Sequence, residues 1–173
     1  MSEVFDKILS RRSIRKFKSD PVPEDLIDKI IKAGTFAATG LGLQSPIIIA
    51  ITNKEVRDRF SRWNAEILGT NTDPFYGAPV VLIVLADRDR TTYVYDGSLV
   101  MGNLMLAAHD LGLGSCWIHR AKEEFERPEG KEFLRSLGIR GNYEGIGHCV
   151  LGYIDGSAPD PKPRKDSYVY YVK

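Results

Sequence analysis

Apolar residues near the start of the chain recur with the period of an α-helix. Two stripes have this spacing: Val4, Phe5, Ile8 and Leu9, then Leu26, Ile27, Ile30 and Ile31. Ser2 stands where a cap precedes the first stripe, and Pro23 suits the first turn of the second. The pattern therefore predicts helices over about 3–11 and from Pro23 through the second stripe.

Continuous apolar runs of strand length follow at 47–51, 80–85, 115–118 and 145–154. Strands that are apolar at nearly every position belong to a sheet covered on both faces. Helices are predicted between them over 54–68, 93–111 and 129–137, the last preceded by the breaker Pro128. The 93–111 helix is apolar on more than one face, so a subunit interface is a natural surface to cover it.

The last residues of the chain are rich in proline and in residues with high β propensity. Prolines at 159, 161 and 163 extend the backbone after the turn at Asp155-Gly156, and residues 168–172 have high β propensity. Proline-rich segments are stiff and reach outside their own domain, and an extended segment can add to the sheet edge of another chain. We expect one domain over 1–173, whose arm at 158–173 reaches a partner subunit.

Composition restricts the class of protein. The 173 residues are 43% hydrophobic and 27% charged, with a formal net charge of +1, which is ordinary for a globular domain and offers no general attraction to nucleic acid. No apolar run has the length of a membrane span, and the N-terminus has no signal-peptide core. We expect a cytoplasmic protein in which Cys116 and Cys149 are buried, reduced thiols.

The strongest local signal is basic. Arg11, Arg12, Ser13 and Arg15 lie within five positions at a predicted helix end, and a second basic cluster spans 162–165. Arginine binds phosphate bidentately and keeps its charge, and a serine hydroxyl adds a short hydrogen bond. Two positive clusters in a nearly neutral protein indicate a specific anion. A solvated basic face is the alternative interpretation of these residues.

Other motifs do not carry chemistry. The glycines of 112–115 leave a helix and enter a strand, which is the reverse of a dinucleotide-binding fingerprint. The three histidines have no metal-ligand spacing, and no serine or cysteine has the context of a nucleophile. Asp96, on the long helix, is interpreted as structural. The residues alone therefore lead to a phosphate-bearing ligand in an α/β dimer.

Several segments, in order, resemble the nitroreductase family. They are RRSIRKF, AATGLGLQSPIIIAIT, APVVLIVLAD, DGSLVMGNLMLAAHDLGLGSCWI, EGIGHCVLGYIDG and KPRK. The resemblance covers nearly the whole chain. It implies an α+β fold of three α/β/α layers with a central mixed sheet, in an intertwined homodimer with FMN at the subunit interface.

The resemblance also implies roles for individual residues. Arg11, Arg12 and Ser13 match positions that bind the FMN phosphate and ribityl chain, and Lys162 and Arg164 match C-terminal phosphate contacts. A further set matches positions around the flavin ring, namely Arg15 near the pyrimidine edge, Thr39, Gly40, Gly42 and Gln44 in a loop from the partner chain, and Cys116, Trp117 and Ile118 in a strand beside the ring.

The function implied is transfer of electrons from NAD(P)H through flavin N5 to a nitroaromatic, a quinone or a similar conjugated acceptor, with no metal. The flavin carries the chemistry, so no catalytic residue is required, although Arg15 is a candidate for stabilising charge on the flavin. Gly42 departs from the family, which has asparagine there, and this leaves the substrate range open. The alternatives are a flavin carrier or redox sensor, a flavin-dependent dehalogenase or dehydrogenase, and a basic interaction module.

Overall fold

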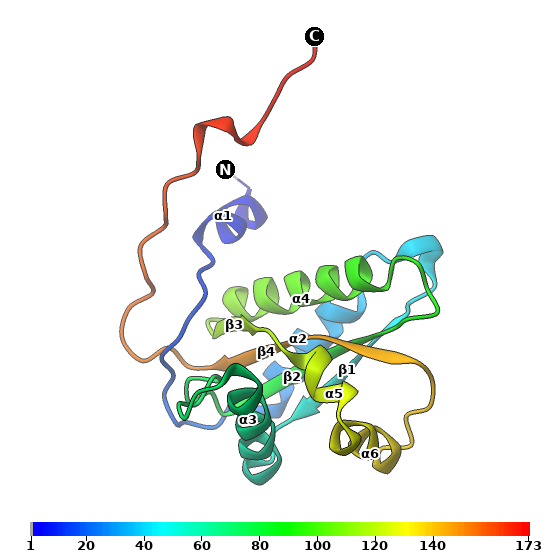
Figure 1. Ribbon diagram of the computed structural model, residues 1–173. Helices are drawn as coiled ribbons and strands as arrows, with labels where there is room; N and C mark the ends of the chain where they lie inside the picture. The colour runs from blue at the N-terminus through cyan, green and yellow to red at the C-terminus, as the bar shows by residue number, and fades with distance from the viewer. Residues whose placement is uncertain (1) are drawn as a thin grey trace.

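The computed structural model describes residues 2–173 and contains six α-helices and four strands (Figure 1). The helices are α1 (Glu3–Ser10), α2 (Glu24–Thr35), α3 (Lys54–Leu68), α4 (Tyr93–Asp110), α5 (Ala121–Glu126) and α6 (Pro128–Ser136). The strands are β1 (Pro46–Ile51), β2 (Val80–Asp87), β3 (Gly114–Ile118) and β4 (Tyr143–Gly152). Each helix and strand expected before the C-terminal arm is present, with boundaries shifted by a few residues at most.

The four strands form one sheet in the order β1-β2-β4-β3, and every neighbouring pair is antiparallel. This corrects the expected mixed sheet, because the one parallel contact described is an isolated bridge between Ser13 and Ser115. The reason lies in the connections. α3 leads the chain away from the end of β1, and residues 69–79 bring it back to that same end of the sheet. β2 therefore begins beside the last residue of β1 and runs in the opposite direction.

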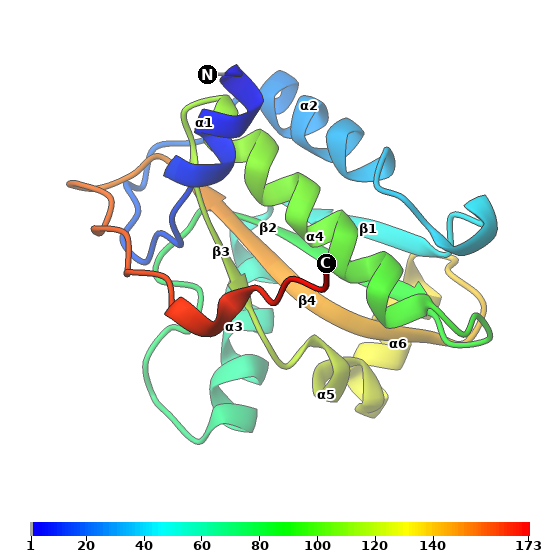
Figure 2. The same ribbon diagram turned by 90° about the horizontal axis from the view of Figure 1, so that it is seen from above.

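The sheet is the middle of three layers, as expected. Along β2 successive side chains alternate between two cores: Val81, Ile83 and Leu85 pack with α3, α5 and α6, whereas Val80, Leu82 and Val84 pack with α2 and α4. All six are 2% exposed or less. Figure 2 shows α2 and α4 lying on the same face of the sheet. This two-sided burial explains the uninterrupted apolar run.

Two helices leave apolar surface uncovered within the chain. α1 has no buried residue, and its stripe of Val4, Phe5, Ile8 and Leu9 is 48–63% exposed. α4 buries Val100, Met101 and Leu104 against the sheet, yet Tyr95 is 71% and Leu99 50% exposed. Contiguous apolar surface of this kind is typical of a contact with another chain.

The C-terminal segment after Ile154 extends away from the body of the chain and rises beside α1 (Figure 1). It contains a short 3₁₀ turn at Asp166–Tyr168, and Tyr170, Tyr171 and Val172 are more than 80% exposed. Residues 168–172, which have high β propensity, form no strand within the chain, although the backbone of Val169 is extended. Among residues 2–173, no helix has the length and apolar character to cross a membrane.

Candidate functional site

The basic segment after α1 is attached to the sheet by its backbone. Ile14 N–H donates to Ser115 O (2.9 Å), and Lys18 N–H donates to Tyr153 O (2.9 Å). Ile14 and Phe17 are buried in the core. Arg15, between these two residues, is exposed, and Arg11, Arg12 and Ser13, which precede Ile14, are half-buried.

Polar atoms in this segment lack partners. Arg11 Nη1, Arg12 Nε and Ser115 Oγ are buried without a hydrogen-bond partner among the described residues. Arg12 Nη1 donates to the carbonyl oxygens of Leu9 (2.7 Å) and Arg11 (2.8 Å), which fixes the direction of its guanidinium. Buried cationic donors without acceptors are costly. An anion with several oxygens, such as a phosphate, would supply the missing acceptors.

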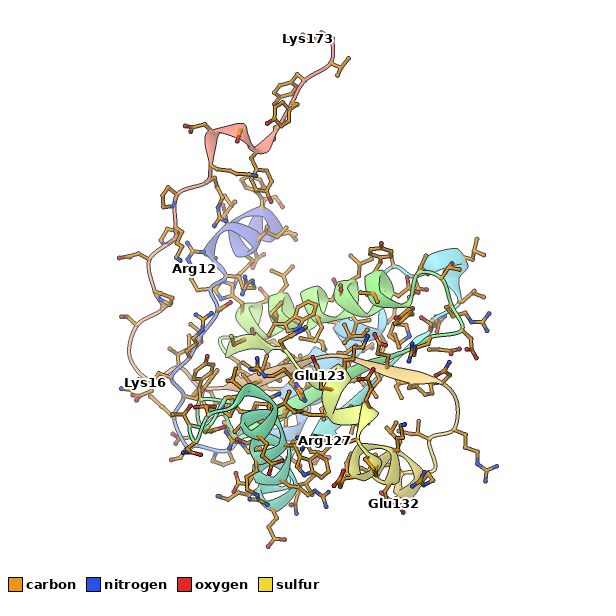
Figure 3. The ribbon with its side chains drawn as sticks, in the orientation of Figure 1. Arg12, Lys16, Glu123, Arg127, Glu132 and Lys173 are labelled. Atoms are coloured by element: carbon orange, nitrogen blue, oxygen red, sulfur yellow. The ribbon has the colours of Figure 1, made fainter. Side chains whose placement is uncertain are left out.

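The second basic cluster meets the first in a cleft of about 930 Å³ between α1 and the C-terminal arm. Its lining combines Arg11 and Arg12 with Lys162 and Arg164. Figure 3 shows Arg12 below α1, on the side that faces the ascending arm. The convergence of basic segments from the start and the end of the chain, expected from the sequence, is thus present within one chain.

A smaller polar cleft of about 430 Å³ adjoins the same segment. Ser13 and Arg15 line it together with Asp155 and residues 157–160. Lys16 Nζ lies 2.7 Å from Asp155 Oδ2, which ties the basic segment to the beginning of the arm. Arg15 is exposed and makes no ion pair with the described residues.

β3 is an edge strand beside this segment. Cys116 and Ile118 are buried in the core below the sheet, and Trp117 packs on the opposite face. Burial raises the pKa of the Cys116 thiol, although the charges of Arg15 and Arg11 and a hydrogen bond from Ser13 oppose the shift. Burial also raises the pKa of Cys149 far above its usual range. Both thiols are neutral at pH 7, in agreement with the expectation of buried, reduced cysteines.

Sequence reasoning missed a buried polar network at the end of β3. Asn64 of α3 is fully buried and donates to His119 O (2.9 Å) and Glu124 Oε1 (2.7 Å). Glu124 Oε2 lies 2.8 Å from His148 Nε2, and both residues have no exposed surface. Asn64 follows Phe60 by four residues on the buried face of α3, so its place in an apolar stripe was the available signal.

The loop of Thr39, Gly40, Gly42 and Gln44 is held by Asp96 on α4. The buried Asp96 carboxylate accepts from Gly40 N–H (3.0 Å), Ser45 Oγ (3.0 Å) and Thr92 Oγ1 (3.1 Å). This confirms the structural role expected for Asp96. Gly42 has φ 68°, and a Cβ added there would meet no atom within 4 Å. The left-handed backbone at Gly42 favours glycine. The space that an asparagine side chain would occupy in the family is empty here.

The two groups of site residues do not meet within one chain. The loop is bonded to the first turn of α4, whereas Ser10 Oγ, next to Arg11, lies 2.8 Å from His109 Nε2 in its last turn. A helix of 18 residues is about 27 Å long. Figures 1 and 2 show η1 (Gly40–Gly42) and α1 at opposite ends of α4.

Comparison with known proteins points to one family. The model of the nitroreductase family matches residues 8–75 and 67–153. Two proteins named as NADH dehydrogenase/NAD(P)H nitroreductases are similar to the chain. The one from Methanothermobacter thermautotrophicus is 33% identical over 66% of this chain and 60% of its own length, so the match spans less than two thirds of that protein. The one from Archaeoglobus fulgidus is 30% identical over 97% of this chain and 91% of its own length.

A solved structure gives the same result. The nitroreductase of Bacteroides fragilis, crystallised with bound FMN, superposes with a TM-score of 0.88 over the full length of both chains at 28% identity.

Proposed function

Because the chain belongs to the nitroreductase family, we propose that it is an FMN-dependent oxidoreductase that uses NAD(P)H. The observation that carries this proposal is the convergence of Arg11, Arg12, Lys162 and Arg164 on one cleft, together with two arginine nitrogens that are buried without acceptors. Bound FMN would supply the redox chemistry, accepting a hydride from NAD(P)H and passing electrons to a nitroaromatic, a quinone or a similar conjugated acceptor.

The charge of the described residues suits FMN. Arg11, Arg12 and Ser13 would hold its phosphate and ribityl chain, with Lys162 and Arg164 closing the cleft from the arm. Cys116, Trp117 and Ile118, on the edge strand β3, would lie beside the ring. Arg15, near the pyrimidine edge, would stabilise negative charge that develops there.

A second copy of the chain would complete the site. Thr39, Gly40, Gly42 and Gln44 lie at the far end of α4 from the arginines, so they would approach a flavin from the partner. The exposed apolar residues of α1 and α4 would be covered in the same contact. The arm, residues 158–173, would extend over the partner and provide its β-prone residues with a neighbour. We therefore propose an intertwined homodimer with FMN at the interface.

The experiment has two stages. The purified protein should show the visible absorption of a flavin, and anaerobic NADH or NADPH should bleach it. A colourless protein that does not bind added FMN would refute the proposal at the first stage. A flavin that stays oxidised with both nicotinamides would refute the NAD(P)H-dependent reaction.

Acceptor trials separate the remaining candidates. Nitroaromatics and quinones should support repeated oxidation of NAD(P)H, whereas a flavin carrier or redox sensor would be reduced once without turnover. A flavin-dependent dehalogenase would instead release halide from a halogenated aromatic substrate. Because Gly42 lacks the asparagine side chain that the family has at this position, these trials should compare acceptors of all three classes.

A further inference from the structure

The turn that follows β3 has an unusual backbone arrangement. Arg120 has φ 79°, a left-handed conformation that residues other than glycine rarely adopt. Left-handed backbone at a non-glycine residue persists only where the surrounding contacts impose it, and such positions gather at functional sites. The contacts at this turn come from the buried polar network under β3.

The carbonyl groups of the turn point into the protein. Ile118 O lies 3.4 Å from His148 Nδ1, His119 O accepts from Asn64 Nδ2 (2.9 Å), and Arg120 O accepts from Glu124 N–H (3.1 Å). The N–H groups of His119 and Arg120, in contrast, have no acceptor among residues 2–173. The turn therefore presents backbone donors on the side away from the network.

Asn64 is the centre of this arrangement. Besides its bonds to His119 O and Glu124 Oε1, its Oδ1 accepts from Arg120 Nε (3.0 Å), so it holds both the backbone and the side chain of the turn. Glu124 is in turn paired with His148, and all three residues of the network are fully buried. Each member has a partner, so the network is rigid and specifies one geometry.

We propose that Asn64 is a positioning residue that holds the turn of residues 118–120 so that its free N–H groups face the polar edge of the flavin. The inference rests on the proposed function, in which the preceding residues of β3 lie beside the ring. Donors fixed at the polar edge of a flavin favour its reduced, more negative state, and supporting hydrogen bonds keep such donors in place. Asn64 thus acts on the redox potential without touching the cofactor.

The test compares Asn64→Ala with Ser61→Ala. Ser61 lies on the same helix, is also buried, and donates to Asp73 Oδ1 (2.6 Å), away from the turn. In the FMN-free protein, Asn64→Ala should speed hydrogen exchange at the amide of Glu124, which donates to Arg120 O (3.1 Å) in the turn, and Ser61→Ala should not. In the FMN-loaded protein, Asn64→Ala should shift the midpoint potential to more negative values.

We expect a shift equivalent to a tenfold weaker preference for the reduced flavin, which is about 30 mV for a two-electron couple. An unchanged potential in folded, FMN-loaded Asn64→Ala protein would overturn the inference. An equal shift in Ser61→Ala protein would overturn it too, because general loosening would then explain the effect. If Asn64→Ala does not fold, Arg120→Lys decides, since it keeps the charge and changes the bond to Asn64. An unshifted potential in that variant would count against the inference.

The two levels of proposal fail in different ways. A wild-type protein that binds no FMN refutes the proposed function. A wild-type protein that binds and reduces FMN, with the potential insensitive to Asn64, leaves that function intact and refutes only the positioning role.

Discussion

At the scale of single residues, the candidate site is marked by polar atoms that the chain itself does not satisfy. Arg11 Nη1 and Arg12 Nε are buried without acceptors, whereas buried polar groups elsewhere in a fold are normally paired. Arg57, by comparison, is more deeply buried, and its donors are engaged by Ala78 O, Asp58 and Asp73.

Removal of either site arginine should weaken FMN binding. A hydrogen bond to a charged group contributes about 1.5–3 kcal/mol, so Arg11→Gln and Arg12→Gln should each raise the Kd for FMN roughly 10- to 100-fold. Lys16→Gln is the matched control, because Lys16 is exposed and already paired with Asp155. Fluorescence titration of the FMN-free proteins measures the effect. Equal affinities in the three variants would contradict the phosphate assignment.

Asp73 should make the fold sensitive to acid. Burial alone would raise its pKa, but hydrogen bonds from Ser61, Arg57 and two backbone N–H groups lower it below 3.8. A lowered folded-state pKa contributes stability above pH 3.8 that is lost as the pH falls through the folded value. Asp73→Asn should therefore reduce the free energy of unfolding at pH 7, and the difference from wild type should shrink below pH 3.8. Urea denaturation at both pH values measures this, and a difference independent of pH would contradict it.

At the scale of elements, α4 is the part that organises the site. Its first turn fixes the 39–45 loop through Asp96, its last turn contacts α1 through His109 and Asp110, and its middle packs on the sheet. Because a helix is rigid over this length, it sets the separation between the loop and the basic segment. The resemblance that assigned these two groups to different chains of a dimer agrees with this geometry.

Loss of the Asp96 carboxylate should release the loop. Asp96→Ala leaves Gly40 N–H and two hydroxyl groups without their acceptor, so we expect a loss of about 2–4 kcal/mol in the free energy of unfolding. Hydrogen exchange should increase over residues 39–45. Asp110→Ala, at the exposed end of the same helix, should cost less than about 0.5 kcal/mol. A loop that remains protected in Asp96→Ala protein would show that other contacts hold it.

At the scale of the whole molecule, one chain leaves apolar residues exposed on α1, on the outer face of α4 and on the C-terminal arm. Exposed apolar surface of this kind is typical of a contact with another chain. The proposed site is also incomplete in one chain, since its loop and its arginines are at opposite ends of α4. A symmetric pairing of two chains would resolve both at once.

A charge on the outer face of α4 should therefore dissociate the proposed dimer. Leu99→Glu places a carboxylate in the proposed interface, and the protein should elute with the mass of one chain in light-scattering chromatography and lose FMN affinity. Leu137→Glu is a close control, because Leu137 is 49% exposed against 50% for Leu99 and lies at the end of α6. Identical masses for the two variants would contradict an interface at this face.

Much of the architecture could be predicted from local pattern. The helical stripes of α1 and α2, the apolar runs of β2 and β4 and the end of α4 at Gly112 are visible in the sequence because burial imposes a period on each element. The basic cluster at 11–15 was also visible, because charge is concentrated there within five positions. The antiparallel direction of every strand pair was not visible, since it depends on where each connection returns to the sheet.

The sequence by itself determined which segments form helices and strands, which faces are buried and which residues carry the positive charge, because these follow from near neighbours along the chain. Only the tertiary structure decided that Arg12 and Arg164 line one cleft, that Asp96 holds the loop, and that Asn64, Glu124 and His148 form one network beneath β3. These contacts join residues up to about 150 positions apart. Their geometry is set by the packing of whole elements, and no local pattern encodes that packing.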